Sequence, residues 1–158
     1  MNNEIIVRAM QPTDEKHLFN LRNDPLTFRW YRTPTYITEL EHSNWMKLRL
    51  SDYPFLTLVA QKKFEVIGTA YLTKKNERYE ISVAINPNNQ NEKVGSALVS
   101  SLIKRSLSSG ILEIYAEIHK LNSKSKFFFE GLGFTLIPKT NNLSDEKFSF
   151  YRFSCIEE

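Results

Sequence analysis

Residues 81–107, ISVAINPNNQNEKVGSALVSSLIKRSL, decide the fold of this chain. The stretch begins as a β-branched alternating run, stops at Asn86-Pro87, and continues through a polar loop. Apolar residues then recur at helical spacing, at Val94, Leu98, Val99, Leu102 and Ile103. The order is strand, tight polar loop and helix, and the N–H groups at the start of such a helix form a ready anion site. Gly95 is expected to let the backbone approach a ligand closely, and Ser96 adds a hydroxyl donor.

A second stretch, residues 122–134, reads NSKSKFFFEGLGF. Asn122 is a good helix N-cap, and Gly133 suits the position just after a helix end. This stretch therefore predicts a short helix that leads directly into a strand.

Together the two stretches resemble the GNAT superfamily of acyl-CoA N-acyltransferases. The phosphate-loop pattern of that family, Gln/Arg-x-x-Gly-x-Gly/Ala, falls on residues 90–95. Its later pattern, Asn-x-x-Ala/Ser-x-x-hydrophobic-Tyr-Glu-x-Leu-Gly-Phe, falls on residues 122–134. Two positions depart from the patterns, because Lys93 replaces the first loop glycine and Phe129 replaces the usual tyrosine. The resemblance covers nearly the whole chain and implies an acetyl-CoA-dependent N-acetyltransferase.

Outward from these stretches, the length and composition predict a single domain over residues 1–158. Alternating and β-branched runs predict strands at 4–10, 55–61, 65–72, 79–85, 111–118, 134–137 and 147–155. The resemblance implies an α+β fold with a mixed, mostly antiparallel sheet of six to seven strands. About four helices would flank this sheet, and its central parallel strand pair would be splayed, with Asn86-Pro87 enforcing the break.

Capping residues predict where the helices begin and end. Thr13 or Asp14 caps a short first helix, a capping box at residues 38–41 starts a second, and Gly110 closes the long helix after the loop. The second helix is expected to carry Leu40, Trp45 and Leu48. Residues 24–36 are expected to be irregular, with prolines at both ends.

The resemblance implies that coenzyme A lies against the central strand and the loop after it. The cofactor-binding residues are then Val83, Ala84, Ile85, Gln90, Asn91, Glu92, Lys93, Val94, Gly95, Ser96, Asn122, Ser125 and Phe129. Because a carboxylate repels a pyrophosphate, Glu92 is expected to point into solvent. Phe129 has no hydroxyl to protonate the leaving thiolate, although a thiolate with a pKa near roughly 8.5 needs little help.

Three residues are candidates for the general base. Alternation along 111–118 puts Glu113, Tyr115, Glu117 and His119 on one face. Glu117 is the first candidate, because some protein N-terminal acetyltransferases of the superfamily keep a catalytic glutamate there. Glu80 is the position that other members use, and His119 is the third candidate. Taken alone, each of the three residue types in such a strand is more often a solvated sheet residue than a base.

The acceptor side is expected at residues 21–53, and no metal ion is expected anywhere. Leu-Arg-Asn at 21–23 and Glu-His-x-x-Trp at 41–45 resemble nucleotide-aminosugar N-acetyltransferases of pseudaminic-acid-type biosynthesis. The substrate-binding candidates are Arg22, Asn23, Phe28, Arg29, Trp30, Tyr31 and Trp45. Between residues 22 and 32, Arg22, Arg29 and Arg32 face only one acid, Asp24, which favours an anionic acceptor over a polyamine. A protein N-terminus, another small amine, or a catalytically silent acyl-CoA-binding module remain the alternatives.

Composition limits the remaining classes of protein. A charged fraction of 25% and a hydrophobic fraction of 41% are typical of a globular chain. The net charge of +3 is too small to predict nucleic-acid binding, and no apolar run approaches the length of a membrane span. The single cysteine, Cys155, forbids an internal disulfide, and we expect a cytoplasmic location. The N-terminal residues MNNEIIVRAM do not have the pattern of a signal peptide. We expect a monomer or homodimer.

Overall fold

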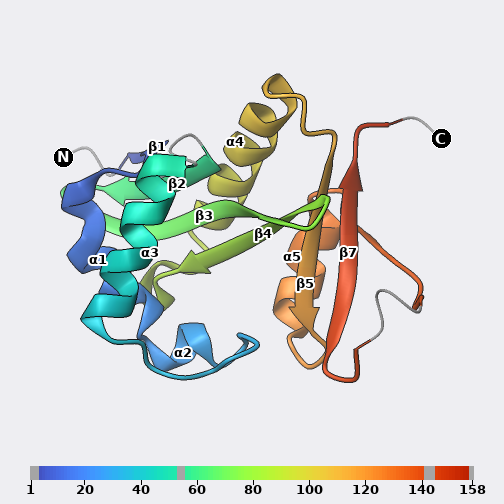
Figure 1. Ribbon diagram of the computed structural model, residues 1–158, viewed down its shortest axis with the longest axis horizontal. Coiled ribbons are helices and arrows are strands. Elements are labelled where there is room, and N and C mark those ends of the chain that lie inside the picture. Colours follow the sequence, from blue (N-terminus) through green and yellow to red (C-terminus); the bar gives the residue numbers. More distant parts are fainter. Residues whose placement is uncertain (1–3, 53–55, 141–144, 157–158) are drawn as a thin grey trace.

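The computed structural model describes residues 4–52, 56–140 and 145–156. One central sheet has helices on both faces (Figure 1). The helices α4 and α5 pack on one face through the larger hydrophobic core, and α1 and α3 pack on the other through a smaller core. The predicted α+β class is confirmed, with a mostly antiparallel sheet and one parallel pair.

The described residues form seven strands in the spatial order β1-β2-β3-β4-β5-β7-β6. The strands are β1 (Ile5–Ala9), β2 (Thr57–Lys62), β3 (Glu65–Lys75), β4 (Arg78–Ile85), β5 (Glu113–His119), β6 (Thr135–Leu136) and β7 (Phe148–Ser154). The α-helices are α1 (Glu15–Arg22), α2 (Pro25–Phe28), α3 (Glu39–Asp52), α4 (Val94–Ser108) and α5 (Ser123–Gly131). Each predicted strand is present. Phe55, the first residue of the predicted strand 55–61, lies outside the described residues.

The helix boundaries follow the capping residues in most places. In the capping box before α3, the Thr38 backbone N–H donates to Glu41 and the Glu41 N–H donates to the Thr38 hydroxyl, at 2.6 and 3.2 Å. The side chain of Asn122 accepts from the N–H of Ser125 and caps α5. After α4, Gly110 has φ +81°, a left-handed conformation that favours glycine.

One stretch that was expected to be irregular is partly helical. Within residues 24–36, the side chain of Asp24 accepts from the N–H of Leu26 at 2.9 Å, and Pro25 starts the short helix α2. An Asp at the N-cap followed by Pro at the first helical position is a helix-start signal as well as a break in the preceding helix. The described residues therefore hold five α-helices, whereas about four were predicted.

The buried face of α3 differs from the predicted one. Leu40 and Leu48 are 69% and 54% exposed, so only Trp45 of the predicted stripe faces inward. The buried positions are instead His42, Met46 and Arg49. These follow helical spacing, but two of the three are polar, and a purely apolar pattern therefore selects the wrong face.

Asp14 is the N-cap residue of α1, as predicted, but its side chain makes no capping hydrogen bond. The side chain of Asp14 turns back to strand β1, where it accepts from both terminal nitrogens of Arg8 at 2.8 and 2.9 Å. It also accepts from the N–H of Gln11 at 2.8 Å. Burial alone would raise the pKa of Asp14, but these hydrogen bonds outweigh it and the pKa lies below its usual value.

The sheet opens in its middle. Strand β4 pairs with β3 along its full length, from Arg78 to Ile85. With β5 it shares one register pair, Glu80 with Tyr115. The splayed parallel pair is therefore confirmed, but the strands separate well before Pro87, which only ends β4. The two halves diverge in Figure 1, with β4 and β5 at an angle.

The ion pair of Asp14 should stabilise the fold. Replacing Asp14 by Asn leaves the Arg8 guanidinium without its charged partner, so the free energy of unfolding should fall by roughly 1–3 kcal/mol. Urea unfolding at pH 7 measures this loss. The exposed Glu77→Gln is the control and should change stability little.

The same variant predicts a pH dependence. Because the folded pKa of Asp14 is lowered, its contribution is complete above the ordinary Asp pKa of 3.8 and disappears as the pH falls through the folded value. The difference between wild type and Asp14→Asn should therefore shrink as the pH falls below 3.8 and through the lowered folded pKa. A difference that stays constant down to pH 2 would contradict this assignment.

Candidate active site

The free edge of β4 is the first component of the site. Cross-strand pairing places Ala84 on the same face as Thr69, toward α1 and α3. Val83 and Ile85 point to the opposite face and pack against the core under α4. Beyond the single pair at Glu80, the β5-facing edge of β4 has no strand partner among the described residues. Backbone polar groups along this edge are thus open to a ligand.

The loop after β4 ends in an open helix terminus. Lys93 is the N-cap of α4, and no side chain caps the helix. The first helical hydrogen bond runs from Ala97 N–H to the Lys93 carbonyl, at 3.1 Å. The N–H groups of Val94, Gly95 and Ser96 therefore lie ahead of the first helical bond and point out of the helix end. Lys93 has φ +61°, a left-handed conformation that favours glycine, and this explains why the GNAT phosphate-loop pattern has glycine at this position.

The polar side chains of this loop contact neighbouring elements. Glu92 is exposed, as expected, and it also accepts from the Lys62 ammonium at 2.6 Å. This ion pair holds the pKa of Glu92 below its usual value. Gln90 accepts from the Lys124 ammonium of α5 at 2.7 Å and so connects the loop to the other half of the sheet.

Gly95 has a packing role that the sequence did not reveal. A Cβ atom added there would lie 3.0 Å from the ring of Phe128 on α5 and 3.8 Å from Ile85. The space beside Gly95 is therefore filled by the protein itself, and the small residue allows α4 and α5 to pack closely. The expectation that this space serves a ligand is thus incomplete.

Across the opening, the α5 candidates occupy two different environments. Asn122 and Ser125 are hydrogen-bonded to each other: the Asn122 side-chain amide donates to the Ser125 hydroxyl at 2.9 Å. Phe129 is only 7% exposed and packs edge-on against Phe128 and Phe134. It is a core residue, and its position supplies no group that could donate a proton.

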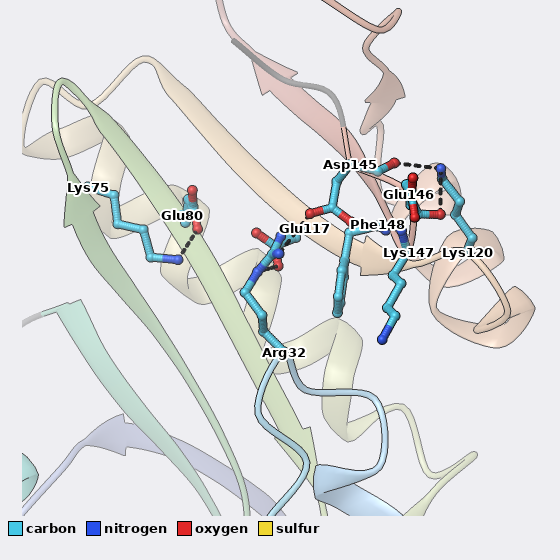
Figure 2. Close-up of polar contacts among 9 residues, drawn as sticks. All are labelled: Arg32, Lys75, Glu80, Glu117, Lys120, Asp145, Glu146, Lys147 and Phe148. Carbon is cyan, nitrogen blue, oxygen red and sulfur yellow. Dashed lines mark hydrogen bonds and ion pairs between the residues drawn. The ribbon is translucent and has the colours of Figure 1, made fainter. Parts of the chain in front are cut away.

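The first candidate base, Glu117, forms an ion pair with the segment after α2. Its Oε1 accepts from Arg32 at 2.7 Å, and Arg32 also donates to Asp145 at 2.8 Å (Figure 2). The guanidinium lies 4.4 Å from the ring centroid of Phe148 on β7. The hydrogen bond from Arg32, helped by two backbone N–H groups, holds the pKa of Asp145 at about 2. Arg32 therefore bridges two carboxylates of the β5–β7 half.

The other two candidates are also engaged. Glu80 accepts from the Lys75 ammonium at 2.6 Å (Figure 2). The Nδ1 atom of His119 accepts from the N–H of Leu121 at 3.2 Å, so the neutral ring carries its proton on Nε2. The ring of Trp30 lies 5.4 Å from the His119 ring, which adds a second contact between the segment and β5. Catalytic roles for Glu117, Glu80 and His119 stay predictions.

A cavity of about 270 Å³ opens on the α1 and α3 side of β4. Its lining comes from α1, the segment after α2, α3, β3 and β4, and consists of Leu18, Leu21, Arg22, Tyr31, Ile37, Glu41, His42, Trp45, Thr69, Tyr71 and Ala84. The walls are mainly apolar and aromatic. Ala84 belongs both to this cavity and to the free edge of β4, so the two features meet there.

The predicted acceptor residues divide into three groups. Arg22, Tyr31 and Trp45 line the cavity. Asn23 and Phe28 are structural, because Asn23 bonds the backbone of Ile37 in both directions and Phe28 is buried. Arg29 lies 4.9 Å from the ring of Trp30, outside the cavity lining. The expectation of three arginines facing one acid is wrong, because Arg32 pairs with carboxylates from distant parts of the chain.

Two lining residues of α3, Glu41 and His42, belong to the Glu-His-x-x-Trp motif but were not among the predicted substrate-binding residues. His42 is 3% exposed, and its ring stacks on Trp45 with 5.6 Å between centroids. The available signal was the helical spacing of His42 with Trp45, Met46 and Arg49. Counting buried polar residues as part of an inward stripe would have found it.

The sequence matches the profile of the acetyltransferase (GNAT) domain over residues 4–135. No curated protein matches the chain. An N-acetyltransferase from Staphylococcus aureus Mu50 has a similar structure, with a TM-score of 0.81, 17% identity, and coverage of 96% of this chain and 98% of that one. The putative acetyltransferase yncA from Salmonella typhimurium, solved with its cofactor acetyl-CoA, has a TM-score of 0.83 and 21% identity, covering 98% and 96%. A ribosomal-protein-alanine N-acetyltransferase from Brucella melitensis has a TM-score of 0.79 and 19% identity, covering 94% and 99%.

These structural likenesses establish the fold, and the profile match spans most of the chain. The chain therefore belongs to the GNAT acetyltransferase family and is an N-acetyltransferase. Within the described residues, no helix has the length and apolar character needed to cross a bilayer.

The bridge made by Arg32 should hold the segment 29–37 closed over the opening. Replacing Arg32 by Ala removes both ion pairs and the contact with Phe148, so chymotrypsin should cleave at Trp30, Tyr31 or Tyr36 several times faster. The control is Arg29→Ala, which removes a cation of the same segment that has no carboxylate partner among the described residues. Equal cleavage rates for both variants would show that the bridge does not restrain the segment.

Proposed function

We propose that this protein transfers the acetyl group of acetyl-CoA directly to a primary amine held in the cavity, within a ternary complex. The observation that carries the proposal is the junction at β4. One side of this strand is a free edge that leads into the open terminus of α4, and its Ala84 forms part of the cavity wall. A thioester on the free edge and an amine in the cavity would meet there.

The pyrophosphate of acetyl-CoA is assigned to the N–H groups of Val94, Gly95 and Ser96. The terminus of a fifteen-residue helix favours negative charge, and Lys93 adds a cation beside it. The carboxylate of Glu92 is neutralised by Lys62, which removes the repulsion that a free acid would cause. Pantetheine would then follow the edge of β4, where backbone N–H groups can polarise the thioester carbonyl.

The acceptor that we favour is the amino group of an amino sugar, as part of a nucleotide-linked sugar. A cavity of 270 Å³ is smaller than the roughly 300–1,000 Å³ of a drug-sized site, so a single ring would fill it. The rings of Tyr31, Trp45 and Tyr71 offer faces for a sugar. The diphosphate and base would lie outside, near Arg22, Arg29 and Trp30. Arg32 is not assigned to the diphosphate, because its guanidinium is already paired with Glu117 and Asp145.

A second candidate acceptor is the N-terminal residue of a protein. The mainly apolar cavity would suit one small side chain beside the amine. One structural neighbour, from Brucella melitensis, is a ribosomal-protein-alanine N-acetyltransferase, which makes a peptide with N-terminal alanine the natural test substrate.

Binding of acetyl-CoA should depend on the open terminus of α4. Ser96→Asp places a carboxylate among the free N–H groups, where it stabilises the helix by about 0.3–1 kcal/mol but repels a pyrophosphate. The dissociation constant for acetyl-CoA should rise at least about tenfold, which corresponds to roughly 1.4 kcal/mol, while the melting temperature stays equal or increases. Calorimetry measures both quantities. Ser100→Asp, on the exposed face of the same helix, is the matched control.

This variant is sharper than a substitution at Gly95, because any side chain there would press on Phe128 and disturb folding as well as binding. Unchanged affinity in folded Ser96→Asp would place the pyrophosphate elsewhere.

The identity of the acceptor is tested by a thiol-release assay with acetyl-CoA. The panel contains a nucleotide-linked amino sugar, a peptide with N-terminal alanine, and spermidine. We expect the amino sugar to have the highest kcat/KM, and Trp45→Ala to raise the KM of the acceptor at least tenfold while the KM of acetyl-CoA stays constant. A preference for the peptide would replace the sugar by the second candidate and leave the acetyltransferase assignment intact.

A further inference from the structure

Acetyl transfer requires that the amine lose its proton inside the cavity. None of the three predicted bases lines that cavity: Glu117 and His119 lie on β5, and Glu80 lies near the start of β4. Each is also bonded to another part of the chain, namely to Arg32, the Leu121 N–H and Lys75. A proton acceptor within the lining itself would reach the amine directly, without a relay.

The imidazole of His42 lies in that lining. Its Nε2 atom is 3.2 Å from the carbonyl of Glu15 on α1, and since a carbonyl can only accept, Nε2 carries the proton in this contact. Nδ1 then holds the lone pair, and it has no hydrogen-bond partner among the described residues. Phe19 and Trp45 hold the ring, with centroids at 5.5 and 5.6 Å.

The unbonded nitrogen of this histidine is open to a ligand. Although the residue as a whole is 3% exposed, Nδ1 is not among the fully buried side-chain atoms that lack a partner in the described residues, so this atom is accessible from outside the protein. His42 lines the cavity, so a ligand there can supply the partner that Nδ1 does not find within the described residues.

The surroundings keep this imidazole neutral near pH 7. Burial lowers the pKa of His42, the Glu15 carbonyl and carboxylate act in the opposite direction, and the positive charge of Arg22 lowers it further. The other ionisable groups of the lining are Glu41 on the same helix, Tyr31 after α2 and Tyr71 on β3. Burial raises the pKa of Tyr31 well above its usual value, so this phenol stays protonated and does not compete as a base.

We propose that His42 is the residue that removes the proton from the acceptor's ammonium group, with Nδ1 as the accepting atom. The N–H bond breaks, the proton moves to Nδ1, and the electron pair stays on the amine nitrogen. This pair forms the bond to the thioester carbonyl carbon as the carbon–sulfur bond breaks. The coenzyme A thiolate takes the second proton, which the nitrogen loses as the amide forms, and the imidazolium releases the first to solvent.

This inference rests on the proposed transfer to an amine in the cavity, but part of it can be tested without turnover. Imidazole nitrogen shifts measured by NMR report the protonation and tautomer of each ring. The chain has three histidines, and the variant His42→Gln identifies the signal of His42. At pH 7.5 we expect a neutral ring with hydrogen on Nε2 and a pKa below 6.5. An imidazolium, or a ring protonated on Nδ1, would overturn the inference whether or not an acceptor is known.

Kinetics provide the second test. In His42→Gln the side-chain amide can still donate to the Glu15 carbonyl, but it cannot take up a proton. With the best acceptor of the panel, kcat/KM should fall by roughly 10²–10⁴ at pH 7, and the decline of wild-type activity at acid pH should disappear. The affinity for acetyl-CoA should stay the same, which separates this loss from a general disturbance. The exposed His17→Gln is the matched control and should behave as wild type.

Glu117→Gln completes the set. If the decline of activity at acid pH disappears in Glu117→Gln but persists in His42→Gln, the base is Glu117 and the assignment to His42 is wrong. If the wild type releases no thiol with any amine, the proposed function fails, and the NMR result still decides the state of His42.

Discussion

The site depends on one constraint in the sheet, the loss of pairing between β4 and β5 after Glu80 and Tyr115. The strands β1–β4 and β5–β7 are thus two halves joined at a single register pair. On one face, α4 and α5 hold the halves together through the contact of Gly95 with Phe128. On the other face, the segment after α2 crosses the opening and is fixed by Arg32 and Trp30. Because both connections leave the edge of β4 itself unpaired, the free backbone of that strand is preserved between them.

The charges around this opening are arranged in two different ways. Outside the cavity, Glu117 is paired with Arg32 and Glu92 with Lys62, in each case a cation from another element. Inside it, burial disfavours charge on any group, including an incoming ammonium. Arg22 adds a positive charge to the wall, which disfavours an ammonium, and the Glu41 carboxylate of the same wall acts in the opposite direction. The same environment that keeps His42 neutral should therefore help the acceptor to lose its proton.

Much of the fold could be predicted, because the responsible signals are local. The box at Thr38, the cap at Asn122 and the alternation along β5 each depend on residues within a few positions of one another. The contacts of Arg32 could not be predicted in this way, because its carboxylate partners lie 85 and 113 residues further along the chain. The inward face of α3 was missed for a different reason. Its buried stripe includes the polar His42 and Arg49, and Arg49 donates to the carbonyl of Leu72 on β3 from a buried position.

The replacement of the family's tyrosine by Phe129 fits this arrangement. The ring is enclosed by Phe128 and Phe134, so a hydroxyl added there would need a polar partner within an aromatic cluster. A thiolate with a pKa near roughly 8.5 leaves without strong assistance, and the attacking nitrogen must lose a second proton in any case. That proton balances the charge on sulfur, so the reaction needs one protein group to accept a proton and none to donate one. A single neutral base in the cavity is then sufficient, and the buried, partly unbonded His42 has the properties of that base.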